Sequence, residues 1–412
     1  MDIGTLTTFV LLFISLFLEV FLLVSFLEKR VEHALKKVSE QERSEPSVCI
    51  VVPCFNEATT LSGTLHSLIS LQYPRDKLEI IVVDDGSSDH TLSIARTFEN
   101  SRPDRRTIRV FSKENGGKHT AMNLALSHTR AELIGGLDAD SIVHSGALLR
   151  IVRVFDNREV AAVTPGIHVR APQTLLQHVQ HVEYRLSVFI RFMLASLGSA
   201  FITPGPFSIF RTSAVRALGG WRHGHSTEDM ELALRIQRAG HLIANVPAAI
   251  VHTTVPCTIR TLFRQRVRWT YGFLRNAADY RNMIANRTYG NLGIMVLPAT
   301  LISIGSALFF FVQMIWYITH MLFKTYARVE LGILPRASFE LYYMNTGAIW
   351  FLAWIAVLCL IILISMGALI GTGKRQLPLA TPLFLLLYTF LVPLWLGTAL
   401  LRAVFRTGVQ WR

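Results

Sequence analysis

Two carboxylates stand one residue apart at the end of an apolar run. Asp138 and Asp140 follow Leu133 to Leu137, with Ala139 between them. The run predicts a buried strand, and ligands of open α/β sheets bind where such strands end. Residues i and i+2 of an extended chain project to the same side, so we expect both acids to face one ligand. Like charges this close repel unless a cation lies between them or one is protonated, which indicates a hard divalent ion, Mg²⁺ or Mn²⁺, with a diphosphate completing its shell.

A second group of residues that could bind a ligand lies on one predicted helix face. Gln265, Arg268 and Trp269 stand at positions i, i+3 and i+4, which share a face of a helix. The planar fork of an arginine suits a diphosphate, and the flat ring of a tryptophan suits a sugar. The alternative is a basic amphipathic helix on anionic lipid with Trp269 at the interface. Both interpretations can hold together, because the segment leads toward apolar stretches.

The elements that position these residues alternate between strand and helix. Apolar runs at 48–52, 79–83 and 108–111 predict strands with helices between them, and we expect Pro53 to stop the first strand. Strict alternation predicts a parallel sheet with right-handed crossovers. The residues that follow each strand should therefore meet at one edge of the sheet.

Polar residues follow each predicted strand. They are Pro53, Asn56 and Glu57 after the first strand, Asp84 and Asp85 after the second, Lys118 after the third and Asp138 after the fourth. A carboxylate after the second strand suits a uracil or ribose, and a lysine near a first helical turn suits phosphate. Each group also has a structural explanation as a turn, a helix cap or a solvated lysine, and the Asp138 pair could be a surface turn. Their coincidence at one sheet edge favours a ligand site.

Composition limits the class of protein. Of 412 residues, 51% are hydrophobic and only 17% are charged, which is too apolar for an ordinary soluble chain. The net charge of +13 suits an anionic membrane face or a phosphorylated substrate. We do not expect a nucleic-acid partner, because no nucleic-acid-binding signature accompanies the arginines. The four cysteines lack a CxxC spacing, so neither a disulfide framework nor a zinc site is indicated.

Four apolar stretches are long enough to cross a bilayer. They are residues 5–27, 292–322, 348–370 and 379–401. The basic residues Lys29, Arg30, Lys36 and Lys37 follow the first stretch, which disfavours a signal peptide and predicts a cytoplasmic domain after it. Four crossings would leave the basic C-terminus outside, against the positive-inside rule. The alternative is that 292–322 lies along the membrane or dips in and out of it; we favour four spans in the inner (plasma) membrane.

The polar clusters together resemble the ordered signatures of family 2 glycosyltransferases. The matching segments are Pro53–Glu57, Val83–Thr91, Gly117–Lys118 with Asn123, and Asp138–Asp140. The resemblance runs from about residue 47 to 269 and implies the α/β GT-A fold, with a Rossmann-like nucleotide half, an acceptor half and a UDP-sugar donor. It implies that Asp85 contacts uracil, that Asp138 lies beside the nucleotide and that Asp140 holds the metal. The other donor-site residues that it implies are Pro53, Asn56, Glu57, Asp84 and Lys118.

Two motifs in the second half of the domain resemble those of particular synthases within this family. Glu183–Tyr184 resembles an element of chitooligosaccharide and poly-N-acetylglucosamine synthases. Gly205 and Pro206 resemble the loop that hyaluronan-type and chitin-type synthases place against the acceptor sugar. The alternatives are that Gly205–Pro206 only shapes a turn and that Glu183 pairs with a nearby arginine.

Thr227, Glu228 and Asp229 open a predicted helix. Their residue types suit any helix start, through capping and the helix dipole. The triplet also resembles the catalytic loop of the family, and an inverting transfer needs one carboxylate to accept the proton of the acceptor hydroxyl. We assign that role to Asp229, and we expect the helix N-terminus to help keep it ionised.

The segment Gln265-x-x-Arg268-Trp269 resembles the mark of processive β-glycan synthases. We therefore expect an inverting polymerase of a UDP-sugar, with N-acetylglucosamine favoured, that passes an exopolysaccharide through the membrane. Its expected partners are the growing glycan and membrane lipids, and a small membrane subunit is left open. The expected segments are a first span (1–28), a linker (29–46), the transferase domain (47–285, divided at 140) and a membrane domain (286–412). The alternatives are single-sugar transfer to a lipid and an inactive sugar-nucleotide-binding scaffold.

Overall fold

The structure is a computed structural model that describes residues 3–35, 45–101, 107–333 and 347–407. Most of the expected linker, at 36–44, lies outside the described residues, as do Lys36 and Lys37.

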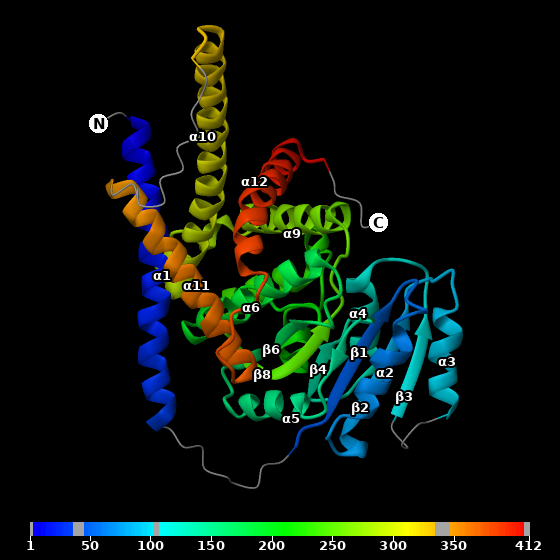
Figure 1. The fold of residues 1–412 in the computed structure, drawn as a ribbon. Coiled ribbons are helices and arrows are strands. Elements are labelled where there is room, and N and C mark those ends of the chain that lie inside the picture. The colour runs from blue at the N-terminus through cyan, green and yellow to red at the C-terminus, as the bar shows by residue number, and fades with distance from the viewer. Residues whose placement is uncertain (1–2, 36–44, 102–106, 334–346, 408–412) are drawn as a thin grey trace.

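One eight-stranded sheet forms the centre of the domain, in the order β3-β2-β1-β4-β7-β6-β8-β5 (Figure 1). The first four strands are β1 (Val48–Cys54), β2 (Leu78–Asp84), β3 (Thr107–Ser112) and β4 (Leu133–Gly136). They pair in parallel, and helices α2 (Leu61–Ile69), α3 (Thr91–Ser101) and α4 (Lys118–His128) connect them. The predicted alternation of strand and helix is confirmed in this half.

Strand β1 continues through Pro53, where we expected it to stop. Val51 O accepts a hydrogen bond from Leu137 N at 2.9 Å, so the polar groups of residue 51 face β4. The missing N–H of residue 53, two positions on, would face the same way. The pairing of β1 with β4 ends at Val51 and Gly136, so the proline removes no hydrogen bond from that ladder.

The second half of the sheet is mixed. Its strands are β5 (Ile142–Val143), β6 (Val160–Val169), β7 (Ser208–Arg211) and β8 (Leu242–Thr253). β7 runs antiparallel to β4 and to β6, whereas β6 and β8 are parallel. The helices around this half are α5 (Ala147–Val152), α6 (Leu175–Ser196), α7 (Thr212–Ala217), α8 (Glu228–Arg238) and α9 (Ile259–Asp279).

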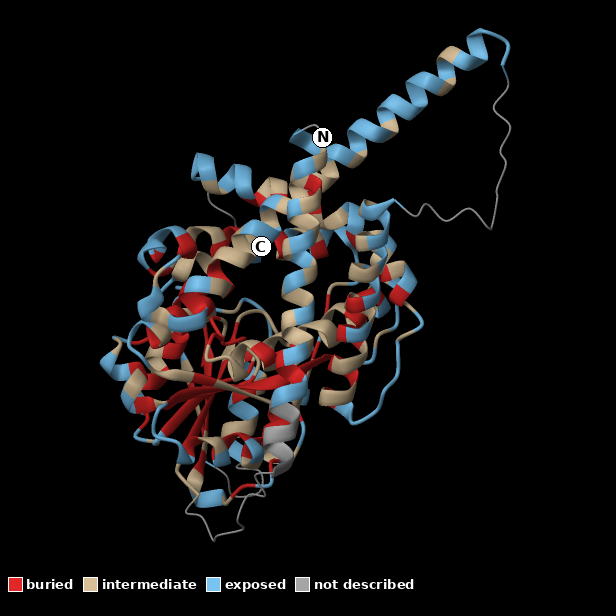
Figure 2. Cartoon of the chain, turned by 90° about the vertical axis from the view of Figure 1, so that its left-hand side faces the viewer, coloured by how far each residue is buried: buried red, intermediate tan, exposed pale blue. Residues whose placement is uncertain are grey.

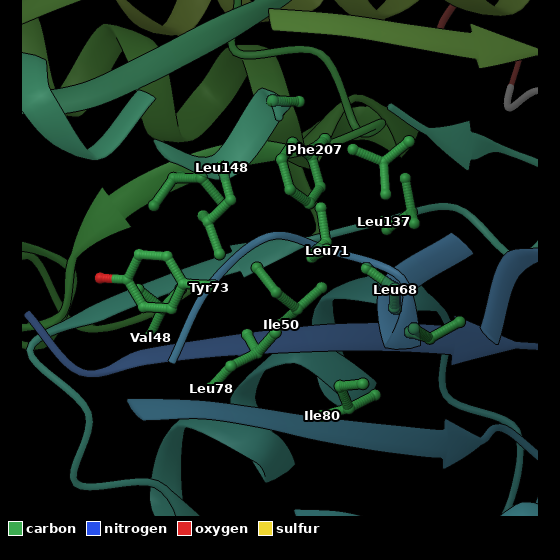
Figure 3. Packing of buried hydrophobic residues seen from close by; sticks show 14 of the residues in the cluster. Val48, Ile50, Leu68, Leu71, Tyr73, Leu78, Ile80, Leu137, Leu148 and Phe207 are labelled. Carbon is green, nitrogen blue, oxygen red and sulfur yellow. The ribbon is translucent and has the colours of Figure 1, made fainter. Parts of the chain in front are cut away.

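Apolar residues fill both faces of the sheet. Ile50, Ile80 and Leu68 belong to one cluster, which also includes Phe207 and Leu137 just beyond the strand ends (Figure 3). Residues that alternate with these along β1 and β2, such as Val51 and Ile81, pack on the opposite face against α4. A strand buried on both faces needs a continuous apolar run, which is why β1, β2 and β4 were visible in the sequence.

Four described helices are long and apolar enough to cross a membrane. The apolar stretches are Ile3–Glu28, Leu292–Glu330, Ala348–Thr372 and Thr381–Phe405. They form α1 (Ile3–Leu35), α10 (Leu297–Glu330) after a π-helical turn (Leu292–Val296), α11 (Ala348–Thr372) and α12 (Thr381–Phe405). Helix α10 leads away from the sheet, α11 returns beside α1, and α12 leads away again (Figure 1). Much of the surface of α10 is exposed in the isolated chain, as expected for a helix that faces lipid (Figure 2).

Candidate active site

The two carboxylates after β4 lie in a turn. Strand β4 ends at Gly136, and Ser141 N donates to Asp138 O at 3.0 Å, which closes the turn over Asp138–Ser141. The expectation of two acids on one face of an extended strand is therefore wrong in its backbone geometry. The acids still interact: burial raises the pKa of Asp140 to about 6, and the charge of Asp138 adds to the rise.

Lys118 supplies a positive charge between the acids of two different elements. Its Nζ lies 2.5 Å from Asp138 Oδ1 and 3.8 Å from Glu228 Oε1. Burial opposes the charge on Lys118, but Asp138 and Glu228 outweigh it and raise its pKa above the ordinary value. A Cβ atom on Gly205 would overlap Lys118 Nζ, so a larger residue there would displace the lysine ammonium from its present position. The structure thus brings the predicted Lys118, Gly205 and Glu228 into one pocket, and the ion pair with Lys118 holds Asp138 beside it.

Asp229 lies in the same pocket, in the first turn of α8. Its Oδ1 accepts a hydrogen bond from Met230 N at 2.8 Å, and its carbonyl accepts one from Thr203 Oγ1 at 2.7 Å. Burial raises the pKa of Asp229 to about 6, Glu228 adds to the rise, and Lys118 acts against it. The expected stabilisation of the ionised form by the helix N-terminus is outweighed by this desolvation. A carboxylate of that pKa is better suited to accept a proton near neutral pH.

Helix α9 docks directly on Thr227. The Thr227 side chain does not cap α8; its Oγ1 donates to Gly224 O at 2.8 Å and accepts from Asn276 Nδ2 at 2.9 Å. A Cβ on Gly272 would overlap Thr227. Trp269, Gly272 and Asn276 stand three and four residues apart, so Trp269 lies on the helix face that approaches the triplet, one turn from this contact.

Replacing Gly272 with alanine tests this close approach. The added methyl group must push α9 away from Thr227, so we expect Gly272→Ala to lower kcat on the order of tenfold to a hundredfold and the free energy of unfolding by about 1–3 kcal/mol. Steady-state rates and thermal unfolding would measure both. Gly305→Ala in α10, where a Cβ meets no atom within 4 Å, is the matched control and should leave both unchanged.

The residues after β1 and β2 hold two loops together. Asn56 Oδ1 accepts a hydrogen bond from Ser88 N at 2.9 Å, and Glu57 N donates to Thr91 Oγ1 at 2.8 Å. Glu57 Oε2 accepts a hydrogen bond from Thr60 Oγ1 at 2.8 Å. Predicted donor-site residues thus shape this edge of the sheet, and Pro53 leads into it from β1.

Asp84 is the last residue of β2 and Asp85 follows it. Their side chains have different hydrogen-bond partners. Asp85 is buried and pairs with Lys113, and its carboxylate accepts hydrogen bonds from Gly116 N at 3.1 Å and Gly117 N at 2.8 Å. Within the described chain, Asp84 Oδ1 is buried without a hydrogen-bond donor. Asp85 therefore shapes the loop before Lys118, and Asp84 has acceptor capacity to spare for a ligand or water.

The residues predicted to share one face of α9 differ in their burial and in their partners. Trp269 is partly exposed and Arg268 is half-buried, whereas the neighbouring Arg266 is buried and lies over the Trp269 ring at 4.2 Å from its centroid. Gln265 Oε1 accepts a hydrogen bond from Arg266 Nη1 at 3.0 Å. Glu183 pairs with Arg266 at 2.6 Å, which is the ion-pair alternative left open by the sequence. Pro206 lies between Gly205 and the buried Phe207, in the loop that leads into β7.

Comparison with known proteins agrees with this geometry. Residues 46–272 match the glycosyltransferase-like family 2, which is more than half of the chain. The chain belongs to this family. The glycosyltransferase is 30% identical over 249 residues to a poly-β-1,6-N-acetyl-D-glucosamine synthase of Staphylococcus epidermidis, covering 60% of this chain and 59% of that protein. A synthase of the same description from Staphylococcus aureus (strain COL) is 29% identical over 250 residues, with 60% of each chain covered. The match thus spans about three fifths of these relatives' length.

A solved structure shows the same fold along nearly the whole chain. It is a mannosyltransferase from Pyrobaculum calidifontis in complex with GDP-Man and Mn²⁺, with a TM-score of 0.58 and 21% identity. The superposition covers 96% of the glycosyltransferase and 99% of that chain. The predicted GT-A-type α/β fold with apolar helices at both ends is therefore confirmed.

The acid pair of the glycosyltransferase fits a divalent cation. Desolvation and Asp138 disfavour a charge on Asp140, and a bound cation would stabilise that charge against both effects. Among the described residues no three His, Cys, Asp or Glu side chains gather as a metal site. A two-carboxylate site matches Mg²⁺, which commonly takes the rest of its shell from substrate phosphates and water.

Two site histidines were not predicted. The rings of His119 and His223 pack edge to face at 5.5 Å between centroids, and burial followed by the charge of His223 lowers the pKa of His119. His119 directly follows Lys118 in the sequence, and this position is the feature that could have identified it as a site residue. Tyr388 of α12, which hydrogen-bonds Glu183, had no local signal because it lies within an apolar stretch.

Proposed function

We propose that this glycosyltransferase is an inverting, processive β-glycan synthase that uses a UDP-sugar, with UDP-N-acetylglucosamine as the favoured donor. The observation that carries the proposal is the single pocket in which Lys118, Gly205 and Asp229 meet. The acid pair lies beside it, and the Gln265–Trp269 helix docks on the same catalytic triplet. The sugar is inferred from the poly-β-1,6-N-acetyl-D-glucosamine synthases to which the chain is similar.

Asp229 acts as the general base in this proposal. It accepts the proton of the acceptor hydroxyl as the hydroxyl oxygen attacks the anomeric carbon, and the bond from that carbon to the UDP oxygen breaks with inversion. Glu228 raises the pKa of the base by its charge, and Thr227 positions the base by anchoring the start of α8 to α9.

Charge on the departing diphosphate is stabilised by cations. Lys118 is held in the pocket by Asp138, and Arg268 lies on α9 one residue before Trp269. Asp138 and Asp140 would hold a divalent ion, which when bound neutralises diphosphate charge. Asp84 and Asp85 lie at the end of β2, beside the loop after β1 that carries Asn56 and Glu57, and we expect the uridine there.

Trp269 is the proposed platform for the acceptor sugar. It lies on the face of α9 that approaches Thr227, and α9 leads through short turns into α10. The catalytic domain is proposed to lie on the cytoplasmic side of the plasma membrane, so the product leaves the pocket toward the spans. This arrangement favours elongation over single transfer, because an acceptor held near a channel can remain bound between additions.

Membranes containing the protein, supplied separately with several UDP-sugars, test the proposal. We expect a distribution of chain lengths from UDP-N-acetylglucosamine, and digestion with linkage-specific hydrolases would identify the bond. A product that stops at one or two sugars on extractable lipid would instead support the lipid glycosyltransferase. Binding of UDP-sugar without release of UDP would support the inactive scaffold.

The pKa of Asp229 predicts the acid limb of the pH profile. A general base works in its ionised form, so kcat/KM should fall as the pH drops below about 6, with a slope of one. Rates measured between about pH 5 and 8 would show the fall, and a flat profile would contradict the assignment. Residual activity of Asp229→Asn should lack this limb.

A further inference from the structure

Three elements meet at the Glu183 carboxylate. Its Oε2 accepts a hydrogen bond from Arg266 Nη2 at 2.6 Å and another from Tyr388 Oη at 2.6 Å. Glu183 belongs to α6, Arg266 to α9 and Tyr388 to the membrane helix α12. The Arg266 guanidinium then lies over the Trp269 ring, 4.2 Å from its centroid. A continuous chain of contacts therefore connects a membrane helix to the proposed acceptor platform.

The chain of contacts is largely shielded from water. The Arg266 side chain is 5% exposed and that of Glu183 is 25% exposed. Hydrogen bonds to ionised groups are stronger than neutral ones, and they are strongest where water is excluded. The planar guanidinium gives Trp269 a flat partner on one face, which favours one ring orientation. The Tyr388 hydroxyl donates to the same carboxylate oxygen as the guanidinium, so it fixes the group that holds the guanidinium.

The ring of Tyr388 has its own packing partners. It contacts Phe384 at 4.6 Å and Trp395 at 5.5 Å between ring centroids. Loss of the hydroxyl alone should therefore leave the ring in place and α12 packed. The hydroxyl can then be tested separately from the fold of the membrane helices.

We propose that Tyr388 is a positioning residue of the membrane domain, which fixes the ring of Trp269 for the acceptor glycan through Glu183 and Arg266. The inference rests on the proposed function, in which Trp269 contacts the acceptor. Tyr388 touches neither donor nor acceptor in this assignment. Its hydroxyl orients the carboxylate, the carboxylate orients the guanidinium, and the guanidinium orients the ring. The helices that would line the product path thereby set the platform from which the glycan enters it.

The full chain in detergent or vesicles allows a direct test with Tyr388→Phe. We expect the KM for an added acceptor oligosaccharide to rise on the order of tenfold, the size expected for losing a hydrogen bond to a charged group. Mean product length should fall, while the KM for UDP-sugar should stay within about twofold. Tyr317→Phe, an exposed tyrosine of α10, is the matched control and should change none of these values.

Arg266→Lys provides a second variant with a different structural effect. It keeps a positive charge for Glu183 but loses the flat surface against Trp269. We expect the same rise in acceptor KM with little change in donor KM. A thermal unfolding midpoint near that of the unaltered chain would exclude general misfolding as the cause for either variant.

A double-mutant cycle separates positioning from general packing. If Tyr388 acts through Trp269, then Tyr388→Phe should have no further effect on acceptor KM once Trp269 is alanine. Multiplicative effects of the two changes, or equal rises in donor and acceptor KM, would overturn the inference. If the unaltered chain adds one sugar and stops, processivity is wrong, and the acceptor KM still tests the role of Tyr388. If it shows no transferase activity with any UDP-sugar, the proposed function and the inference both fail.

Discussion

Asp229→Asn should slow sugar transfer by orders of magnitude while leaving the donor bound. The amide keeps the shape of the carboxylate but cannot accept the hydroxyl proton, so we expect kcat to fall by about 10²- to 10⁴-fold. The KM or Kd for UDP-sugar should change little, because Lys118 and the acid pair remain. Radiolabelled sugar incorporation and equilibrium binding of UDP-sugar would measure the two quantities.

The control for this substitution is an acid outside the pocket. Asp76 is exposed in the short turn before β2, and Asp76→Asn should retain full activity. Polymer formation by Asp229→Asn at the rate of the unaltered enzyme would show that another group accepts the proton. Loss of donor binding together with activity would show that Asp229 holds the pocket together and does not act only as the base.

Asp140→Asn should have the second largest effect. Removal of one of two carboxylates should weaken divalent-ion affinity by at least about a hundredfold, and the KM for UDP-sugar should rise with it. Titration of Mn²⁺ or Mg²⁺ into chelator-treated enzyme would show a displaced half-saturation point. High metal concentration should restore part of the activity.

A neighbouring residue provides the matched control for the metal site. Ser141 Oγ donates a hydrogen bond to Asp140 Oδ1 at 3.0 Å without contributing charge. Ser141→Ala should therefore shift the metal titration much less than Asp140→Asn. Full activity of the unaltered enzyme after exhaustive chelation would contradict a metal-dependent reaction and leave Lys118 and Arg268 as the cations for the diphosphate.

Local sequence pattern was sufficient for the elements of the sheet. The apolar runs predicted β1, β2 and β4, because a strand covered on both faces must be apolar at every position. The same pattern gave a wrong backbone prediction at two positions. Pro53 lies inside β1 because its missing N–H faces a ladder that has already ended, and Asp140 lies in a turn because β4 stops at Gly136. Both details depend on where a neighbouring strand ends, and a single segment carries no such information.

Residue types located the pocket but did not determine the partners within it. Lys118, Asp138 and Asp229 were all selected from motifs, yet the pKa of about 6 for Asp229 comes from burial and from Glu228. The structure also shows different contacts for the neighbouring arginine. Motif spacing selected Arg268 for the diphosphate, and Arg266 pairs with Glu183 and lies over Trp269.

The sequence by itself determined the family, the alternation of strand and helix in the nucleotide half, and the presence of four apolar stretches. These follow from periodicity, residue type and order, which are local properties of the chain. Only the tertiary structure decided that Gly272 meets Thr227 and that Tyr388 shares Glu183 with Arg266. Those contacts join residues that are 45 and 205 positions apart, and they depend on how whole helices pack, for which no spacing rule along the chain exists.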